Sequence, residues 1–172
     1  AGKIIAGQHV KAACQRHLRD LEKAASRGYF FDLTKVNRVI GFFRDVLKLN
    51  GGQYEGKPYD LLPWQCFIVG SLFGWVDANY VRRFRVAYIE TAKGSGKSPM
   101  AAGIGLYGMV ADGESRAEIY AAATKKDQAM VLFRDAVAMV DQSPVLRKVI
   151  SKSGGTGKEW NLAYHKASAF FR

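Results

Sequence analysis

Residues 84–99 read FRVAYIETAKGSGKSP, and this stretch decides the fold. It opens with an apolar run at residues 86–89, whose β-branched and aromatic side chains suit a buried strand. Gly94 and Gly96 then allow the backbone to turn sharply with its N–H groups facing inward. From residue 98 to about residue 111 the apolar residues have helical spacing. The stretch therefore predicts a strand, a tight loop and a helix in succession.

A glycine-rich loop between a strand and a helix is typical of the phosphate loop of nucleotide-binding proteins. Lys97 is expected to reach the β- and γ-phosphate oxygens, and the Ser98 hydroxyl is expected to bind Mg²⁺. One departure is Thr91, which stands where the pattern has its first glycine. A glycine-rich turn with an incidental lysine is the alternative, but the flanking strand and helix patterns favour a nucleotide site. The residues predicted to contact nucleotide in this loop are Thr91, Ala92, Lys93, Gly94, Ser95, Gly96, Lys97 and Ser98.

The composition is that of a folded domain or of part of one, with 172 residues of which 48% are hydrophobic. The formal net charge of +11 favours a polyanionic partner such as DNA or RNA over ordinary solvated charge. No apolar run is long enough to span a membrane, and the start carries no secretory signal pattern. Cys14 and Cys66 fit no metal spacing and predict buried free thiols in a reducing compartment.

A further candidate contact lies in the segment LLPWQCFIV, residues 61–69, which predicts a helix with Pro63 at its first position. Gln65 falls near the start of that helix. Its amide presents one donor and one acceptor side by side, which matches N6 and N7 of adenine. A plain surface glutamine is the alternative, but in a chain with a phosphate loop we favour adenine contact.

Basic residues flank these motifs on both sides. Arg82, Arg83 and Arg85 predict either an edge that faces DNA or nucleotide, or strand-edge charges that discourage aggregation. After the loop helix, residues 116–123 predict a second strand, and Thr124 predicts the cap of another helix. The lysines that follow Thr124 suit either DNA contact or a simple capped helix start.

The part of the chain that precedes the glycine-rich loop is predicted to be mainly helical. A first helix is expected over residues 4–27, and a second begins at a cap formed by Asp32 or Thr34. This interpretation divides the chain into a helical N-terminal segment at residues 1–57 and a nucleotide-binding part at residues 58–172.

The C-terminal part carries a second glycine-rich stretch, SGGTGK at residues 153–158. Glu159 replaces the Ser or Thr of a phosphate loop, and no strand is expected before it. We interpret these residues as a flexible connection. Residues 166–172 predict the beginning of a third strand.

Hydrolysis of ATP requires an acidic residue that ends a later apolar strand and holds Mg²⁺, often with a glutamate beside it. Asp112 and Asp141 each follow an apolar run, but both runs read as the ends of helices, and the chain contains no Asp-Glu pair. The predicted fold is therefore an α/β P-loop NTPase fold of the ASCE type. It has a parallel sheet flanked by helices, is incomplete at its C-terminal side, and follows a helical N-terminal segment.

The order of these motifs resembles the large terminase subunit of tailed bacteriophages over nearly the whole chain. The specific part is the pairing of PWQ with FGW, whereas GKS alone is common. The stretches that carry the resemblance are LLPWQ at 61–65, LFGW at 72–75, RRFR at 82–85, KGSGKS at 93–98 and TKKDQA at 124–129.

This resemblance implies an ATPase that uses ATP and Mg²⁺ to drive double-stranded DNA into a viral procapsid. It implies a metal-dependent nuclease domain in the full-length protein, whose carboxylates cannot be placed in these residues. The implied partners are the small terminase subunit, the portal protein and other copies in a ring. The implied location is the host cytoplasm, with transient docking on the procapsid and no membrane.

The resemblance also assigns catalytic roles to two lysines. In this family a basic residue ahead of the loop lysine, usually an arginine, senses or stabilises the γ-phosphate. Lys93 occupies that place here, so bidentate contact is lost. Lys97 and Lys93 are thus the implied catalytic residues.

Two other functions fit part of the pattern. A DEAD-box helicase also carries a GSGKS-like loop after an upstream glutamine, but the Pro-Thr-Arg-Glu-Leu stretch of that family is missing after the second predicted strand. A non-catalytic basic DNA-binding module would bind DNA without needing ATP.

Overall fold

The structure is a computed structural model that describes residues 5–172. Its first element is helix α1 (Gln8–Lys23), which continues into a short 3-10 turn η1 (Ala24–Arg27). Gly28, in the left-handed region at φ 76°, ends this unit. The helix predicted over residues 4–27 is therefore confirmed from Gln8 onward, whereas residues 5–7 are not helical and residue 4 lies outside the described residues.

The next helices follow the expected signals. Helix α2 (Leu33–Val46) begins at Asp32, whose carboxylate accepts from the backbone N–H groups of Thr34 and Lys35, so Asp32 is the cap. A 3-10 turn η2 (Gly52–Tyr54) lies in the loop that follows. Helix α3 (Pro63–Gly74) has Pro63 in its first turn, as predicted. The short strands β1 (Tyr29–Phe31) and β2 (Trp75–Asp77) pair antiparallel beside these helices.

The loop helix and its successors form the second half of the molecule. Helix α4 (Lys97–Val110) confirms the helix predicted after the glycine-rich loop. Helix α5 (Lys126–Gln142) follows, but its cap residue is Lys125 and makes no side-chain bond, so the predicted Thr124 cap is wrong. Thr124 lies one residue too early to reach the free N–H groups. A short helix α6 (Pro144–Val149) completes this part.

The main sheet has four strands in the order β3-β6-β5-β4. Only β3 and β6 run parallel, while the β6–β5 and β5–β4 pairs are antiparallel. The α/β class is confirmed, but the sheet is mixed, because β4, β5 and β6 are joined by connections too short for parallel crossovers. The strands are β3 (Glu118–Ile119), β4 (Ile150–Ser153), β5 (Asn161–Tyr164) and β6 (Ala169–Phe171).

The structure of the sheet corrects two predictions made from the sequence. The stretch at 153–158 is preceded by a strand, β4, and forms the turn of the β4–β5 hairpin, so the expectation that no strand precedes it is wrong. The strand expected at residues 86–89 does not form: these residues have no assigned secondary structure and no partner strand among the described residues. Val86 and Tyr88 are consequently 86% and 87% exposed. Composition favours a strand here, whereas a strand forms only with a neighbouring partner strand.

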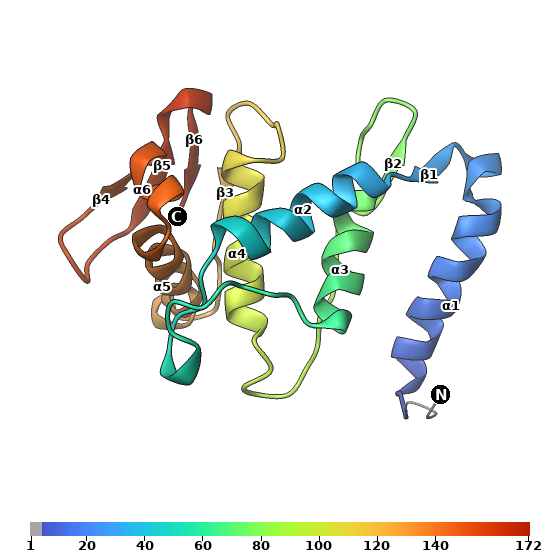
Figure 1. Ribbon diagram of the computed structural model, residues 1–172, viewed down its shortest axis with the longest axis horizontal. Helices are drawn as coiled ribbons and strands as arrows, with labels where there is room; N and C mark the ends of the chain where they lie inside the picture. The colour runs from blue at the N-terminus through green and yellow to red at the C-terminus, as the bar shows by residue number, and fades with distance from the viewer. Residues whose placement is uncertain (1–4) are drawn as a thin grey trace.

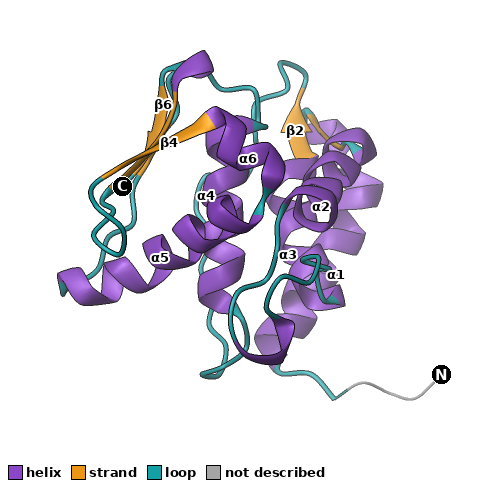
Figure 2. Cartoon of the chain, turned by 60° about the vertical axis from the view of Figure 1, so that its left-hand side comes forward, coloured by secondary structure: helices purple, strands orange, loops and turns teal. Residues whose placement is uncertain are grey.

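One hydrophobic core joins the helices to the inner face of the sheet. Figure 1 shows α2 lying across α3 and α4, with α5 beyond α4 on the side of the sheet and α1 apart at the opposite end. In Figure 2 the four-stranded sheet lies on one side of the molecule and the helices lie beyond it. Phe43 of α2, Leu106 of α4 and Phe171 of β6 are each at most 1% exposed and belong to the same core. Helix α2 therefore packs with the nucleotide-binding part across the predicted boundary at residue 57, which stays a prediction.

Candidate functional site

The glycine-rich loop leads directly into α4, as the sequence indicates. Gly94 and Gly96 lie in the left-handed region at φ 81° and 82°, which side chains other than glycine rarely adopt. Gly96 is the N-cap of α4, and its carbonyl accepts the first helical bond from Met100 at 3.1 Å. The free N–H groups of the first turn of α4 therefore border the loop. A helix start of this kind favours bound anions.

The Lys97 side chain bonds back to the start of the loop. Its Nζ donates to the carbonyl oxygens of Thr91 at 2.7 Å and Ala92 at 2.9 Å. The Thr91 and Ser95 hydroxyls also contact each other across the loop. The Lys97 ammonium can exchange these two carbonyl partners for phosphate oxygens. Phosphate oxygens are stronger partners because they carry full negative charge. Lys97 thus lies at the start of α4 with its ammonium at the loop, and its contact with phosphate stays a prediction.

Lys93 and Ser98 flank this loop in the sequence, since Lys93 precedes Gly94 and Ser98 follows Lys97. Ser98 is half-buried in the first turn of α4, and Lys93 is exposed. Residues 5–172 contain no group of three or more His, Cys, Asp or Glu side chains that could hold a metal ion. A single hydroxyl is nonetheless a donor set that fits Mg²⁺, because this ion is usually held by one or two protein ligands together with phosphates and water.

Gln65 is brought next to the loop, but it faces inward. The side chain is 3% exposed, and its Oε1 accepts from the Leu62 backbone N–H at 2.9 Å at the start of α3. Its Nε2 lies 3.3 Å from the point where a Cβ of Gly96 would stand. Adenine reading by Gln65 stays a prediction. It requires both amide atoms to turn away from these contacts.

The arginines ahead of the loop are mostly engaged within the protein. Arg82 pairs with Asp112, and Arg83 donates to Asp20 at 2.8 Å while stacking on Trp75 at 5.4 Å. Arg85 is exposed. Of the two alternatives for this cluster, a structural role therefore accounts for Arg82 and Arg83, and Arg85 is left facing solvent.

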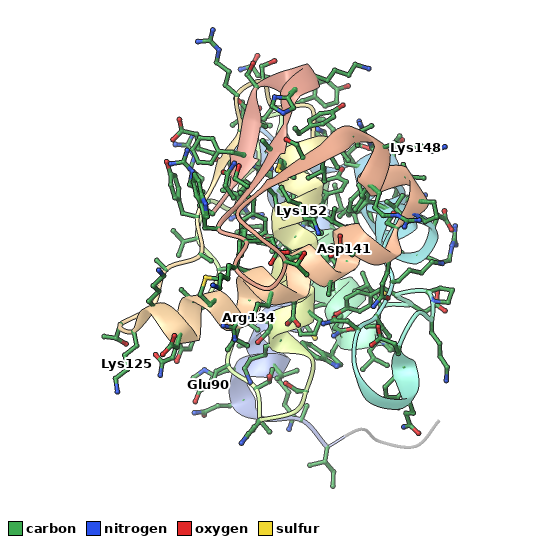
Figure 3. All side chains as sticks on the ribbon, turned by 90° about the vertical axis from the view of Figure 1, so that its left-hand side faces the viewer. Glu90, Lys125, Arg134, Asp141, Lys148 and Lys152 are labelled. Carbon is green, nitrogen blue, oxygen red and sulfur yellow. The ribbon has the colours of Figure 1, made fainter. Side chains whose placement is uncertain are left out.

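Of the two acidic residues considered from the sequence, one lies in a helix and the other lies just after one. Asp141 belongs to α5 and accepts from Lys152 of β4 at 2.6 Å and 2.9 Å; the two side chains point toward each other in Figure 3. Asp112 follows the C-terminal end of α4, the end opposite the phosphate loop. The prediction that neither aspartate ends a sheet strand is confirmed. In the same view Lys125 lies at the free end of α5.

A groove of about 600 Å³ runs along α4 between the segment before the loop and β3. It is lined by no residue of 91–98, so it is separate from the phosphate loop. The lining includes Phe84, Arg85, Ile104, Gly108, Ile119 and Leu132.

Sequence reasoning missed a buried polar group behind the loop. Tyr59 is 3% exposed, and burial raises the pKa of its hydroxyl well above the ordinary range. Asp135 of α5 lies near Tyr59 and accepts from the Asn50 amide at 3.0 Å. Burial raises the pKa of Asp135, an effect that the Asn50 hydrogen bond partly offsets. These residues are far apart in sequence, so no local spacing could have indicated the group.

Other features of the chain complete the description. Cys14 and Cys66 are free, as predicted, but Cys14 is exposed and Cys66 is only partly buried, so the predicted burial is wrong. Among residues 5–172, no helix combines the length and the apolar character that a membrane crossing needs.

Comparison with known proteins gives two matches. A family model described as "Terminase large subunit, ATPase domain" matches residues 63–159. The crystal structure of the HK97 bacteriophage large terminase superposes with a TM-score of 0.65 at 23% sequence identity, over 80% of this chain. The match covers 26% of that terminase, so the chain spans about a quarter of its length. At this identity the superposition establishes a shared fold. No curated protein matches the chain.

Proposed function

Since this chain belongs to the terminase large subunit family, matched through its ATPase domain, we propose that residues 91–98 bind ATP with Mg²⁺ for hydrolysis. In this proposal the loop N–H groups surround the β-phosphate and Lys97 contacts the β- and γ-phosphate oxygens. Ser98 would be the protein ligand of Mg²⁺, which supplies charge neutralisation for the transferred phosphoryl group when bound. Lys93, exposed beside the loop, stabilises charge on the γ-phosphate.

The observation that carries this proposal is the Lys97 arrangement. An ammonium at the start of a helix, bonded to two loop carbonyls at 2.7 Å and 2.9 Å and framed by two left-handed glycines, suits phosphate binding. A glycine-rich turn with an incidental lysine would not need this geometry.

The wider role follows from the family and is also a proposal. Hydrolysis in the full-length protein drives double-stranded DNA into a procapsid, in a ring that works with the small terminase subunit and the portal protein. A nuclease domain and the missing carboxylate lie in the rest of that protein, which acts in the host cytoplasm while docked on the procapsid. The net charge of +11 suits a DNA partner.

The test is ATP hydrolysis by the full-length protein with and without double-stranded DNA, together with filter binding of DNA with and without nucleotide. We expect Mg²⁺-dependent hydrolysis and DNA binding that responds to nucleotide. A protein that binds DNA equally in both conditions and hydrolyses no ATP would instead be a non-catalytic DNA-binding module.

A further inference from the structure

We propose that the outer face of the four-stranded sheet binds single-stranded nucleic acid by stacking its bases on a row of aromatic side chains. The row consists of Tyr120, Phe170 and Trp160, with the Arg172 guanidinium between the last two. These four residues form the aromatic row. The inference goes beyond the proposed ATPase function, which concerns residues 91–98.

The aromatic row lies on the side of the sheet that faces away from the helices. Phe171 of β6 points inward, where its ring centre lies 5.6 Å from that of Phe133 in α5. Arg172 continues this strand, since its N–H donates to the Ile119 carbonyl at 3.0 Å. Successive side chains of a strand point to opposite faces, so Phe170 and Arg172 point outward. In Figure 2, α4, α5 and α6 lie on one side of the sheet, and no helix of the described residues covers its other side.

Each member of the row contacts the next. The rings of Tyr120 and Phe170 meet edge-on with their centres 5.5 Å apart. The Arg172 guanidinium lies 4.3 Å from the centre of the Phe170 ring and 5.9 Å from the centre of the Trp160 ring. Tyr120 follows β3, Phe170 lies in β6 and Trp160 precedes β5. The row therefore runs across three neighbouring strands of the sheet.

The row leaves a large aromatic surface in contact with water. Trp160 is 55% exposed and Tyr120 is 62% exposed, while Phe170 is half-buried. A single exposed hydrophobic residue is ordinary on a protein surface. A contiguous row of them marks a surface that binds something.

The outward residues do not suit a helix from another part of the protein as the bound group. A sheet face that helices cover carries aliphatic side chains, as the inner face does with Ile119 and Leu162. The positions paired with Phe170 on the outer face are instead Glu118 and Ala163. A charged and a small residue around aromatic rings offer little aliphatic surface for a helix to bury.

Nucleic-acid bases match the chemistry of the row. Every base has a π-face that stacks on aromatic rings, and a single strand leaves those faces free, whereas a duplex uses them internally. Arg172 Nε donates to Asn161 Oδ1 at 3.2 Å, and among residues 5–172 the guanidinium forms no ion pair. Its terminal nitrogens are therefore available to a phosphate between two stacked bases.

Positive charge continues around the row. Arg116 precedes β3, Lys158 lies in the β4–β5 turn, and Lys166 lies in the 3-10 turn η3 (His165–Ala167) between β5 and β6. All three are exposed. The acidic Glu118 is engaged on the same face, because its carboxylate accepts from the Tyr120 hydroxyl at 2.9 Å. A polyanion is therefore attracted to this side of the sheet, with an affinity that falls as salt rises.

The experiment measures the binding of short fluorescein-labelled oligo-dT and oligo-rU to the full-length protein by fluorescence anisotropy. Tyr120→Leu and Trp160→Leu remove an aromatic face and keep the apolar bulk. We expect each variant to weaken the binding of both probes by about tenfold, the effect of one lost stacking contact. Binding of a DNA duplex of matched charge should be unchanged, because no charged residue is altered.

Matched controls are Tyr54→Leu and Tyr80→Leu, whose side chains are 54% and 60% exposed in other parts of the fold. We expect both to bind the single-stranded probes like the wild type. All variants should keep the wild-type urea midpoint and the wild-type rate of ATP hydrolysis. Oligo-dT should also quench tryptophan fluorescence, and this quenching should decrease in Trp160→Leu.

The possible outcomes separate the alternatives. Dependence of either single-stranded probe on the aromatic residues supports the proposal. Unchanged affinities in Tyr120→Leu and Trp160→Leu would overturn it. Equal losses for the duplex would overturn it too, since the sheet would then contact the phosphate backbone and not the bases.

Two further results would assign the row to a protein contact and so overturn the proposal. One is a change in the number of subunits in Tyr120→Leu, measured by light scattering, without a change in affinity for the probes. The other is a Trp160 that acrylamide cannot quench in the wild type, because another part of the full-length protein would then cover it. A wild type that hydrolyses ATP but binds neither probe would overturn this inference alone and leave the proposed function standing.

Discussion

Arg83 donates to the Asp20 carboxylate across 2.8 Å, and this ion pair joins α1 to the segment that leads into the phosphate loop. Asp20 is 4% exposed, whereas Leu18 and Leu21 of the same helix are 61% and 52% exposed. Burial by itself would raise the pKa of Asp20, but hydrogen bonds and charges from Arg27 and Arg83 outweigh it and hold the pKa below its ordinary value. Polar contacts therefore contribute much of the stability with which α1 packs against the rest of the protein.

Replacing Asp20 with asparagine should reduce the free energy of unfolding by about 3 kcal/mol at neutral pH, because Arg83 would keep its position without a counter-charge. The folded-state pKa of Asp20 is lowered, so its contribution is present above the unfolded pKa of about 4 and is lost as pH falls through the folded value. In urea denaturation, the free energies of unfolding of the wild type and of Asp20→Asn should therefore converge as the pH falls into the acid range.

The control for this change is Asp45→Asn. Asp45 pairs with Arg44, and both side chains are 60% exposed, so its loss should alter stability little. Equal losses in the two variants, or a difference that persists in acid, would contradict the role given to Asp20.

A second contact makes the docking of α1 sensitive to pH nearer neutrality. Trp75 Nε1 donates to His17 Nδ1 at 3.2 Å, so that nitrogen accepts and the ring is neutral. Burial lowers the pKa of His17, the charge of Arg16 lowers it further, and Asp20 opposes them. The contribution of neutral His17 is therefore present above the unfolded pKa of about 6.5 and is lost as pH falls through the lower folded value.

We expect the wild type to lose stability between pH 7 and pH 5, and a His17→Gln variant to lose less over that range. The measurement is the urea midpoint at several pH values. His9→Gln, an exposed change on the same helix, should follow the wild-type profile. Parallel profiles for all three proteins would rule out His17 as the titrating group.

Lys97→Ala tests the phosphate loop directly. In the full-length protein we expect ATP hydrolysis to fall by about 10³-fold or more, because the charge on the β- and γ-phosphate oxygens is lost at the transition state. Steady-state phosphate release measures this, and Lys11→Ala on α1 is an exposed control. Wild-type turnover by the Lys97 variant would show that the loop is not the catalytic site.

A structural feature of this protein can be predicted from the sequence when it depends on residues that are neighbours in the chain. The loop and its helix were predicted because GSGKS acts through its own backbone, and Asp32 was a recognisable cap because its partners are the next few residues. Strand β4 was missed because ISKS has one large apolar residue and no alternation.

The remaining misses depend on contacts between distant parts of the chain. The strand expected at residues 86–89 has the right composition, but composition cannot supply a pairing partner. The inward-facing amide of Gln65 follows from its place in the first turn of α3, which a Gln after Pro63 could have suggested, since such a residue often reaches back to the N-cap N–H. Its closeness to Gly96 comes from the packing of two segments that are distant in the sequence.

The last prediction is that the 172-residue chain by itself binds nucleotide weakly and does not turn it over. The loop, Lys97 and Ser98 are all present, so binding is expected. Hydrolysis also needs a carboxylate that fixes Mg²⁺ and orients the attacking water. Among the described residues, Asp112, just after α4, and Asp141 of α5 are each held in an ion pair, and the sequence holds no Asp-Glu pair to replace them.

Two measurements on the purified chain test this. Binding of ATP in Mg²⁺ should be detectable by calorimetry and absent in Lys97→Ala, while phosphate release should stay at the level of a blank. The basic surface should still bind DNA, with an affinity that falls steeply as salt rises. If Mg²⁺-dependent phosphate release appeared and vanished in Lys97→Ala, the missing acid would lie within these residues. Asp112→Asn and Asp141→Asn would then identify it, since only the variant of the catalytic aspartate would lose turnover while retaining ATP binding.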